Sequence, residues 1–342
     1  MITPTRPQLP AYGGVHLEAT RGRLTARGTN GETTVTAVAR VSNVTDGTVL
    51  VPPGPVQKYL AALPEDTELV VASASRTQLE VTPAGGNGYK FTAMPDSFPT
   101  NPIPRRDKVE ADLSDLDDAV AAVAGCADSL GGSEKVVQLV SDATGLKLHA
   151  TDRFRVARAS LPPAAGFGDF DGLLPVRVLT LVAALDATHV QVDPRGRSMV
   201  FHAADAVVST RLAQDPFPVV DSVLSAEVPY TASLARATVL AALKRLSSVA
   251  PQNGTVTVDL SGDQLTLAVV NAAAGSGSEV VHLEGPASGD LSTAVNLEFL
   301  RSAFDTHTAD VVTLGWVAAL KPLFVTSTDT VPITHAIMPV QV

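Results

Sequence analysis

The sequence predicts an α+β protein made of three copies of one unit, in which helices pack on antiparallel strands. Three recurring signals support this: a marker strand, a helix-strand pair and a closing segment, all repeating at nearly the same period. The marker strand begins with a turn and a leucine, and it recurs at Leu24, Leu146 and Leu265, which are 122 and 119 residues apart. Alternation of apolar and polar residues within these strands is typical of antiparallel sheets with one buried face.

The second and third signals repeat with the same spacing. A helix that follows Pro or Asn and leads into a strand aligns on Leu63, Leu185 and Phe304, again 122 and 119 residues apart. Pro or Asn at such a position favours a helix N-terminus. The closing segments read FTAMPDSFP, RLAQDPFP and HAIMPVQV, and Phe98 and Phe217 in the first two are 119 residues apart. Three signals with one period indicate a true internal repeat.

Two of the three units open with an amphipathic helix. It is predicted over residues 113–130 and 234–250, where apolar residues recur at helical spacing. In the first unit the equivalent position would fall before residue 1, so we expect that unit to lack its opening strand and helix. A start position placed too late and a genuine shortening of the protein explain this equally well. The stripes consist of Leu116, Val120, Val123 and Ala127 in one helix and Leu240, Leu243 and Leu246 in the other.

Polar and Pro-rich segments at 99–108 and 222–230 separate the units. The predicted domains are therefore residues 1–103 (the first repeat, shortened), 104–224 (the second repeat) and 225–342 (the third repeat).

Composition narrows the function. The net charge of -10 means that any DNA-binding surface must gather its basic residues locally. The chain has one cysteine, Cys126, predicted to be a small core residue, and no apolar run long enough to span a bilayer. No signal peptide is recognisable, so we expect a cytoplasmic protein without membrane contact. The seven histidines lack metal-ligand spacing and are expected on the surface or in strands. Without a nucleophile elbow or phosphate loop, we expect no enzyme, cofactor or metal.

Four local motifs, taken with the repeat, resemble the bacterial DNA polymerase III beta sliding clamp family. They are RPQLPAYGGVHLEA at 6–19, ATDRFRVA at 150–157, DPFPVVDSVLS at 215–225 and MPVQV at 338–342. The resemblance covers nearly the whole chain, and the order and spacing of the motifs carry it.

The resemblance implies a processivity factor rather than an enzyme. Two chains would pair head to tail into a ring that encircles double-stranded DNA without sequence preference. Strands would form the outer wall, and helices would line the hole. DNA polymerase, the clamp loader and repair proteins would dock through short peptides. An alternative is a clamp-like protein-interaction module that binds replication peptides without encircling DNA, which the missing opening helix and an acidic second-repeat helix favour.

The resemblance also implies a peptide-binding pocket between the second and third repeats. An apolar cleft with a few polar groups suits peptide anchors. Arg153 and Phe154 stand where the family has Gly and His, and Gln341 and Val342 replace its Arg and Leu, so we expect a reshaped pocket. The pocket residues carried over are Thr151, Asp152, Arg155, Val156, Pro218, Val223, Pro322, Met338, Pro339 and Val340.

DNA contact requires lysine and arginine facing the phosphates. The predicted lining is thinly charged, because the helix at 113–130 carries Asp115, Asp117, Asp118 and Asp128 and no basic residue. The candidate DNA-facing residues on the other helices and the first linker are Lys58, Arg105, Arg106, Arg177, Arg236, Lys244, Arg245 and Arg301.

Overall fold

A computed structural model describes residues 7–341 of the chain, apart from 43, 76, 96–97, 100–108, 111–112, 133, 163–167, 193–196 and 253. The chain forms two compact units, one of residues 1–111 and 185–212 and the other of residues 112–184 and 213–342. The second predicted repeat is divided between them, because its last strands continue the sheet of the first repeat. The boundaries at 103 and 224 remain a prediction about repeats in the sequence.

The first unit contains an eight-stranded antiparallel sheet in the order β4-β1-β2-β3-β15-β14-β13-β8 and a three-stranded sheet β5-β6-β7. A short 3-10 helix, η1 (Pro10–Gly13), precedes the strands, and α1 (Pro53–Leu60) connects the two sheets. The strands are β1 (Val15–Thr20), β2 (Arg23–Thr29), β3 (Thr33–Arg40), β4 (Gly47–Val51), β5 (Leu69–Ser75), β6 (Gln78–Pro83), β7 (Tyr89–Thr92), β8 (Val109–Glu110), β13 (His189–Val192), β14 (Ser198–His202) and β15 (Ala206–Arg211).

The first repeat has a small core. Val49, Val51, Leu79 and Val81 form its buried cluster, and α1 contributes no fully buried side chain. Val71 on β5 is 41% exposed, whereas Val312, at the equivalent place after the helix of the third repeat, is fully buried. The described part of the first repeat has one α-helix where the third has two, so nothing equivalent to the opening helix covers Val71. The first repeat, as far as it is described, therefore has one α-helix fewer than the third.

The second unit has an eight-stranded sheet, β12-β9-β10-β11-β23-β22-β21-β16, and a four-stranded sheet, β19-β18-β17-β20, all antiparallel. Its strands are β9 (Val136–Asp142), β10 (Gly145–Thr151), β11 (Arg155–Leu161), β12 (Phe170–Pro175), β16 (Tyr230–Ala235), β17 (Thr255–Ser261), β18 (Gln264–Asn271), β19 (Gly275–His282), β20 (Leu291–Asn296), β21 (Val311–Trp316), β22 (Leu323–Ser327) and β23 (Ile333–Ile337).

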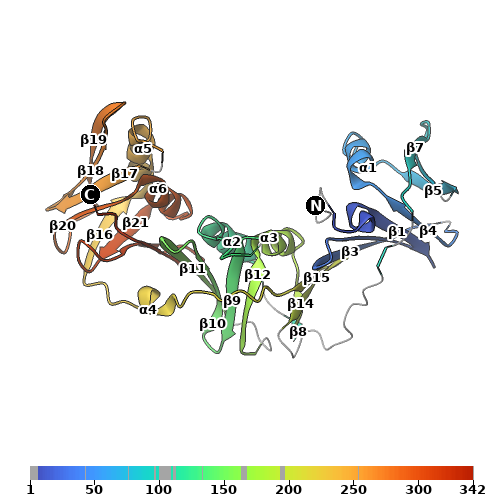
Figure 1. Ribbon diagram of the computed structural model, residues 1–342, viewed down its shortest axis with the longest axis horizontal. Coiled ribbons are helices and arrows are strands. Elements are labelled where there is room, and N and C mark those ends of the chain that lie inside the picture. The colour runs from blue at the N-terminus through green and yellow to red at the C-terminus, as the bar shows by residue number, and fades with distance from the viewer. Residues whose placement is uncertain are drawn as a thin grey trace. The chain divides into compact units, whose positions relative to one another are not determined.

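The helices of the second unit pack in pairs against these sheets (Figure 1). Helix α2 (Leu116–Ala124) packs on α3 (Val176–Ala184), and α5 (Arg236–Leu246) packs on α6 (Leu297–Asp305). The short α4 (Asp221–Leu224) lies in the segment predicted as a linker.

Helix α5 begins later than predicted, because residues 230–235 belong to β16 and run directly into the helix without a side-chain cap. Its apolar stripe is nevertheless as expected: Leu243 and Leu246 are buried in the core of the third repeat with Phe304 and Trp316. Asn296 caps α6 by accepting a hydrogen bond from the backbone N–H of Phe299. The predicted α+β class with antiparallel sheets is confirmed.

Two seams join consecutive repeats in the same way. In the first unit, β3 pairs with β15, with Thr33 opposite Thr210 and Ala37 opposite Ala206. In the second unit, β11 pairs with β23, with Arg155 opposite Ile337. The third strand of one repeat therefore pairs with the last strand of the next. The corresponding strands left over are β19 and β7, and each is the edge of its sheet.

Candidate functional site

The β10–β11 turn places the ATDRFRVA motif at the end of two paired strands. Thr151 is buried, its hydroxyl donates to the Arg155 carbonyl at 2.7 Å, and it accepts from the Arg153 N–H at 3.0 Å. The Asp152 carboxylate accepts from the N–H groups of Phe154 and Arg155 at 3.1 and 3.0 Å. Thr and Asp side chains therefore replace the backbone partners that the turn lacks, which explains why these residue types occur here.

The same turn occurs in the first repeat. Thr29 donates to the Thr33 carbonyl, and Asn30 accepts from the N–H groups of residues 32 and 33. The residue after Asn30 is Gly31 with φ +96°, whereas the equivalent Arg153 has φ +75°. A left-handed backbone costs a non-glycine residue roughly 1–2 kcal/mol. The substitution of Arg for the family's Gly therefore leaves the turn intact at a local cost in strain.

Arg155 fixes the base of the turn. Its Nε donates to the Asp152 carboxylate at 2.9 Å, its Nη2 donates to the Gly125 carbonyl after α2, and its guanidinium lies 4.2 Å from the ring centre of Phe299 on α6. With 13% of its side chain exposed, Arg155 connects β11 with α2 and α6. Its role in the structure is to hold the turn in place.

An apolar cluster lies beside this turn. Val156 on β11 is buried with Val220 and Leu224, and Phe217 packs against this cluster. The cluster brings the FP-containing segment and α4 onto the strand, and the predicted residues Pro218 and Val223 are half-buried within that segment. Phe217, Val220 and Leu224 were not among the residues predicted for this site. The FP motif and the apolar spacing of 217–224 were the available signals for them.

The C-terminal segment forms the other side of the site. The Met338 N–H donates to the Phe154 carbonyl at 2.9 Å, and the Val340 N–H donates to the Ala294 carbonyl on β20 at 2.8 Å. Met338 and Val340 are 43% and 40% exposed, and Phe154 is 65% exposed. The turn, the cluster beside Val156 and the chain end thus belong to one compact unit, with apolar side chains left in contact with solvent. No described contact ties Pro322 to the turn, although it is half-buried in the same unit.

Most candidate DNA-facing arginines are engaged in ion pairs. Arg177 on α3 pairs with Glu134 at 2.8 Å, Arg245 on α5 makes two hydrogen bonds to Glu279 on β19, and Arg301 pairs with Glu298 on α6. The hydrogen bonds that Arg245 donates to Glu279 raise the pKa of Arg245, so that pair remains charged. These arginines carry little free positive charge toward a partner.

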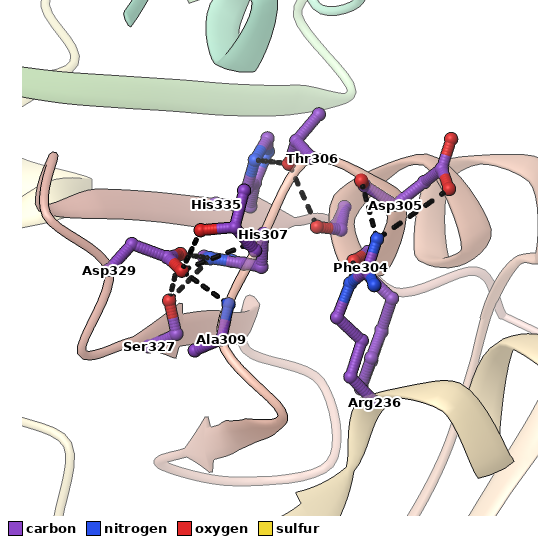
Figure 2. Close-up of polar contacts among 11 residues, drawn as sticks. Arg236, Phe304, Asp305, Thr306, His307, Ala309, Ser327, Asp329 and His335 are labelled. Carbon is purple, nitrogen blue, oxygen red and sulfur yellow. Dashed lines mark hydrogen bonds and ion pairs between the residues drawn. The ribbon is translucent and has the colours of Figure 1, made fainter. Parts of the chain in front are cut away.

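Arg236 has a structural task. Its guanidinium donates to the carbonyls of Phe304 and Asp305 at 3.0 and 3.1 Å and thereby caps the C-terminal end of α6 (Figure 2). Lys58 and Lys244 are exposed, and neither has an ion pair within the part of the chain that the structure describes. Arg105 and Arg106 lie outside the described residues.

Three of the aspartates predicted for the second-repeat helix lie at the start of α2. Asp117 and Asp118 lie in its first turn and Asp115 precedes it, so their charges favour the positive end of the helix. Cys126, just beyond the helix, is buried as predicted, and burial raises the pKa of its thiol to about 11.

The histidines were expected on the surface or in strands; six of the seven lie in strands, and His307 is buried in the loop after α6. His149, His202, His307 and His335 are buried. His307 Nδ1 lies 2.7 Å from the Asp329 carboxylate, and Ser327 is hydrogen-bonded to both (Figure 2). The N–H groups of Thr308 and Ala309 donate to the same carboxylate.

A second buried histidine lies beside this network. His335 on β23 contacts the Thr306 hydroxyl at 2.8 Å and the Cys126 sulfur at 3.9 Å. Burial, reinforced by His307 and Arg155, lowers the pKa of His335 to about 3, so it is neutral at pH 7. These contacts join the end of α6, the β22–β23 loop and the end of α2. Since Ser327 and Asp329 both face the same ring nitrogen, in a position closed to solvent, the group holds loops together and is no nucleophilic site.

No protein-family profile matches the chain. The beta sliding clamp of Streptococcus pneumoniae TIGR4 is 21% identical over 343 residues, which cover 94% of this chain and 89% of that protein. The beta sliding clamp homolog GriR of Streptomyces muensis is 26% identical over 272 residues, covering 77% of this chain and 72% of that protein.

Solved structures agree with these relatives. A DnaN sliding clamp from Pseudomonas aeruginosa bound to griselimycin matches 100% of this chain and 94% of its own, with a TM-score of 0.88 and 17% identity. The DNA polymerase III beta subunit of Thermotoga maritima matches 99% of this chain and 94% of its own, with a TM-score of 0.87 and 21% identity. The chain is therefore similar in sequence to bacterial beta sliding clamps and has the fold of their solved structures.

Proposed function

We propose that this chain is a DNA polymerase processivity factor: two copies close into a ring around duplex DNA, and a surface site on the ring holds polymerase and other replication or repair proteins. The activity needs no catalytic group, because confinement by a closed ring replaces tight binding. A ring that cannot leave the duplex sideways can still slide along it.

The observation that carries the proposal is the pair of unpaired edges. Within the chain, the third strand of one repeat pairs with the last strand of the next at both seams. The remaining third strand is β19 and the remaining last strand is β7, and both are sheet edges. One chain cannot use both edges in the same pairing pattern without bending back on itself. A head-to-tail second copy satisfies both, and in a closed point group with two such seams neither β19 nor β7 is left unpaired.

The ion pairs on the helices are consistent with this mode of holding DNA. Arg177, Arg245 and Arg301 share their charge with glutamates, and α2 presents aspartates. A site that relies on counterion release needs free cations facing the phosphates. We infer that retention on DNA comes from topology and that Lys58 and Lys244 contribute weak, sliding contacts.

The test is retention on circular DNA. The chain is incubated with a nicked circular plasmid together with a cognate clamp loader, and the complex is separated from free protein by gel filtration. We expect a solution mass of about twice 35.4 kDa, retention on the circle, and release when a restriction enzyme linearises it. Binding that survives linearisation would indicate ordinary affinity. A monomer that is never retained would favour the alternative, a clamp-like module that binds replication peptides without encircling DNA.

We further propose that the turn at 151–155, the cluster around Val156 and the chain end at 338–340 form the peptide-docking site. Exposed apolar side chains beside buried polar anchors are typical of such sites. The adaptable thioether of Met338 suits more than one ligand. Phe154 adds an aromatic ring at the rim, where the family resemblance has a histidine.

Phe154→Ala is expected to weaken binding of a peptide probe about fivefold, since an exposed aromatic anchor contributes on the order of 1 kcal/mol. Griselimycin is the probe, because a neighbour of the same fold was crystallised with it. Isothermal titration measures its Kd. The matched control is Val270→Ala on β18, a valine that is 78% exposed and outside the site. Equal affinities for Phe154→Ala and the unmodified chain would contradict this assignment.

A further inference from the structure

An unusual cluster of arginines lies at one end of the large sheet of the first unit. Arg21 belongs to the two-residue turn between β1 and β2, Arg23 begins β2, and Arg40 ends β3. Arg23 and Arg40 are directly opposite in the antiparallel register, and the Val41 N–H donates to the Gly22 carbonyl at 3.1 Å. We call Arg21, Arg23 and Arg40 the arginine cluster; all three are exposed.

Two local features of the cluster are unfavourable for stability. Like charges directly opposite each other destabilise a strand pair. Arg23 and Arg40 are the only opposed lysine, arginine or carboxylate residues of like charge in the described strand registers. The equivalent pair in the third repeat is Gln264 and His282.

The second unfavourable feature is the turn. Arg21 and Gly22 have φ of +46° and +77°, the two positive values of a type I′ hairpin turn. Asn, Asp or Gly is preferred at the first of these positions, because a larger side chain clashes with the backbone there. The equivalent turn of the third repeat has Gly262 at that place. Residues that break a local rule without a structural gain are typical of functional positions.

Within the described residues, no carboxylate forms an ion pair with the arginine cluster. Six other arginines form ion pairs, such as Arg27 with Glu18 on the neighbouring strand. None of the three arginines of the cluster has one within the described residues. The nearest carboxylate contact is Asp46, which accepts the backbone N–H of Arg21 at 3.3 Å. Three guanidinium groups therefore present fixed positive charge on a protein whose net charge is -10.

We propose that the arginine cluster is an accessory binding site for the phosphate backbone of duplex DNA, separate from the helix faces. The planar guanidinium fork matches phosphate oxygens, and three such groups at one strand end can span neighbouring phosphates. An acidic protein segment would also be attracted. Protein partners need apolar anchors, however, and no large exposed apolar side chain occurs between residues 10 and 59 of the described chain. The site extends the proposed function by adding a second DNA contact.

The test is equilibrium binding of a linear 30-base-pair duplex, measured by fluorescence anisotropy at several salt concentrations. We expect R21Q/R23Q/R40Q to bind about tenfold more weakly at 50 mM salt. A plot of log K against log salt concentration should also be less steep for this variant. Its slope should be smaller in magnitude by about 2.7, the value for three phosphate contacts. The variant should unfold at no lower temperature than the unmodified chain, because the Arg23–Arg40 repulsion is removed.

The matched control is K135Q/R197Q/R211Q, which removes the same charge from three other exposed positions. An equal loss of affinity in the control would overturn the proposal, because net charge would then be the cause. A fluorescent poly-glutamate peptide that binds as tightly as the duplex and loses affinity in R21Q/R23Q/R40Q would also overturn it, in favour of an acidic protein partner. Linear DNA does not require a closed ring, so these outcomes are independent of retention on a circle.

Discussion

Asp329→Ala is expected to lower the free energy of unfolding by about 3–5 kcal/mol, the range for removing one partner of a buried charged group. The Asp329 side chain is 3% exposed and accepts hydrogen bonds from the His307 ring, the Ser327 hydroxyl, and the N–H groups of Thr308 and Ala309. Alanine would leave those donors buried without an acceptor. The α6–β21 loop and the β22–β23 loop would lose the group that joins them.

Chemical denaturation at pH 7.5 measures this loss of unfolding free energy. The pH must be fixed because the network contains groups with shifted pKa values. Burial alone would raise the pKa of Asp329, but hydrogen bonds from Ser327, His307 and Thr308 outweigh it and hold the pKa well below its usual value. A lowered carboxylate pKa contributes stability that is present above about pH 4 and lost as pH falls further. Burial also lowers the pKa of His307 and His335. Their contribution is present above about pH 6.5 and declines as pH falls toward 3.

The control for Asp329→Ala is Asp310→Ala. Asp310 is exposed in the same loop, and its backbone carbonyl, which the substitution keeps, accepts the Arg236 N–H. Its removal should change stability by no more than about 0.5 kcal/mol. If the two variants unfold at the same denaturant concentration, the buried network does not hold the loops together.

The repeat was accessible from the sequence, whereas this network was not. Leucines at 24, 146 and 265 mark equivalent strands, because the same strand must bury the same face in each copy. His307 and Asp329 are 22 residues apart in different loops, and no local pattern shows that they meet. The same holds for the arginines: Glu134 and Glu279 reach Arg177 and Arg245 only in the folded chain. A sequence shows which helix positions carry lysine or arginine. Whether such a side chain is already paired with a carboxylate depends on residues that are distant in the sequence.

The candidate site was likewise predicted in part, and the rest of it depends on contacts between residues distant in the sequence. The turn at 151–155 was predicted through its resemblance to a family motif, and its Thr and Asp make the hydrogen bonds that such a turn needs. The positive φ of Arg153 would have passed unnoticed without Gly31 in the equivalent turn for comparison. Phe217, Val220 and Leu224 were missed because α4 folds onto β11 from a segment that reads as a linker.

Ser278→Pro is expected to convert the proposed dimer to a monomer of about 35.4 kDa and to abolish retention on circular DNA. The Leu283 N–H donates to the Asp263 carbonyl on the β18 side. Because N–H directions alternate along a strand, the N–H of Ser278 points away from β18 toward the open edge. Proline there removes a donor needed by a second copy while leaving the β18–β19 ladder intact. A loss of about 3 kcal/mol at each of the two seams raises the dissociation constant of the dimer on the order of 10⁴-fold.

The opposite edge provides an independent variant of the same experiment. The Ala93 N–H donates to the Thr77 carbonyl, so by the same alternation the N–H of Lys90 on β7 points away from β6. Lys90→Pro should therefore also yield a monomer, although Lys90 and Ser278 lie in different repeats and different compact units. Ser278→Ala keeps the N–H and should remain dimeric. Sedimentation equilibrium and plasmid retention report mass and topology separately. If both proline variants stay dimeric and remain on the circle, the chains do not close through these edges, because a strand edge without its donor cannot extend the neighbouring sheet.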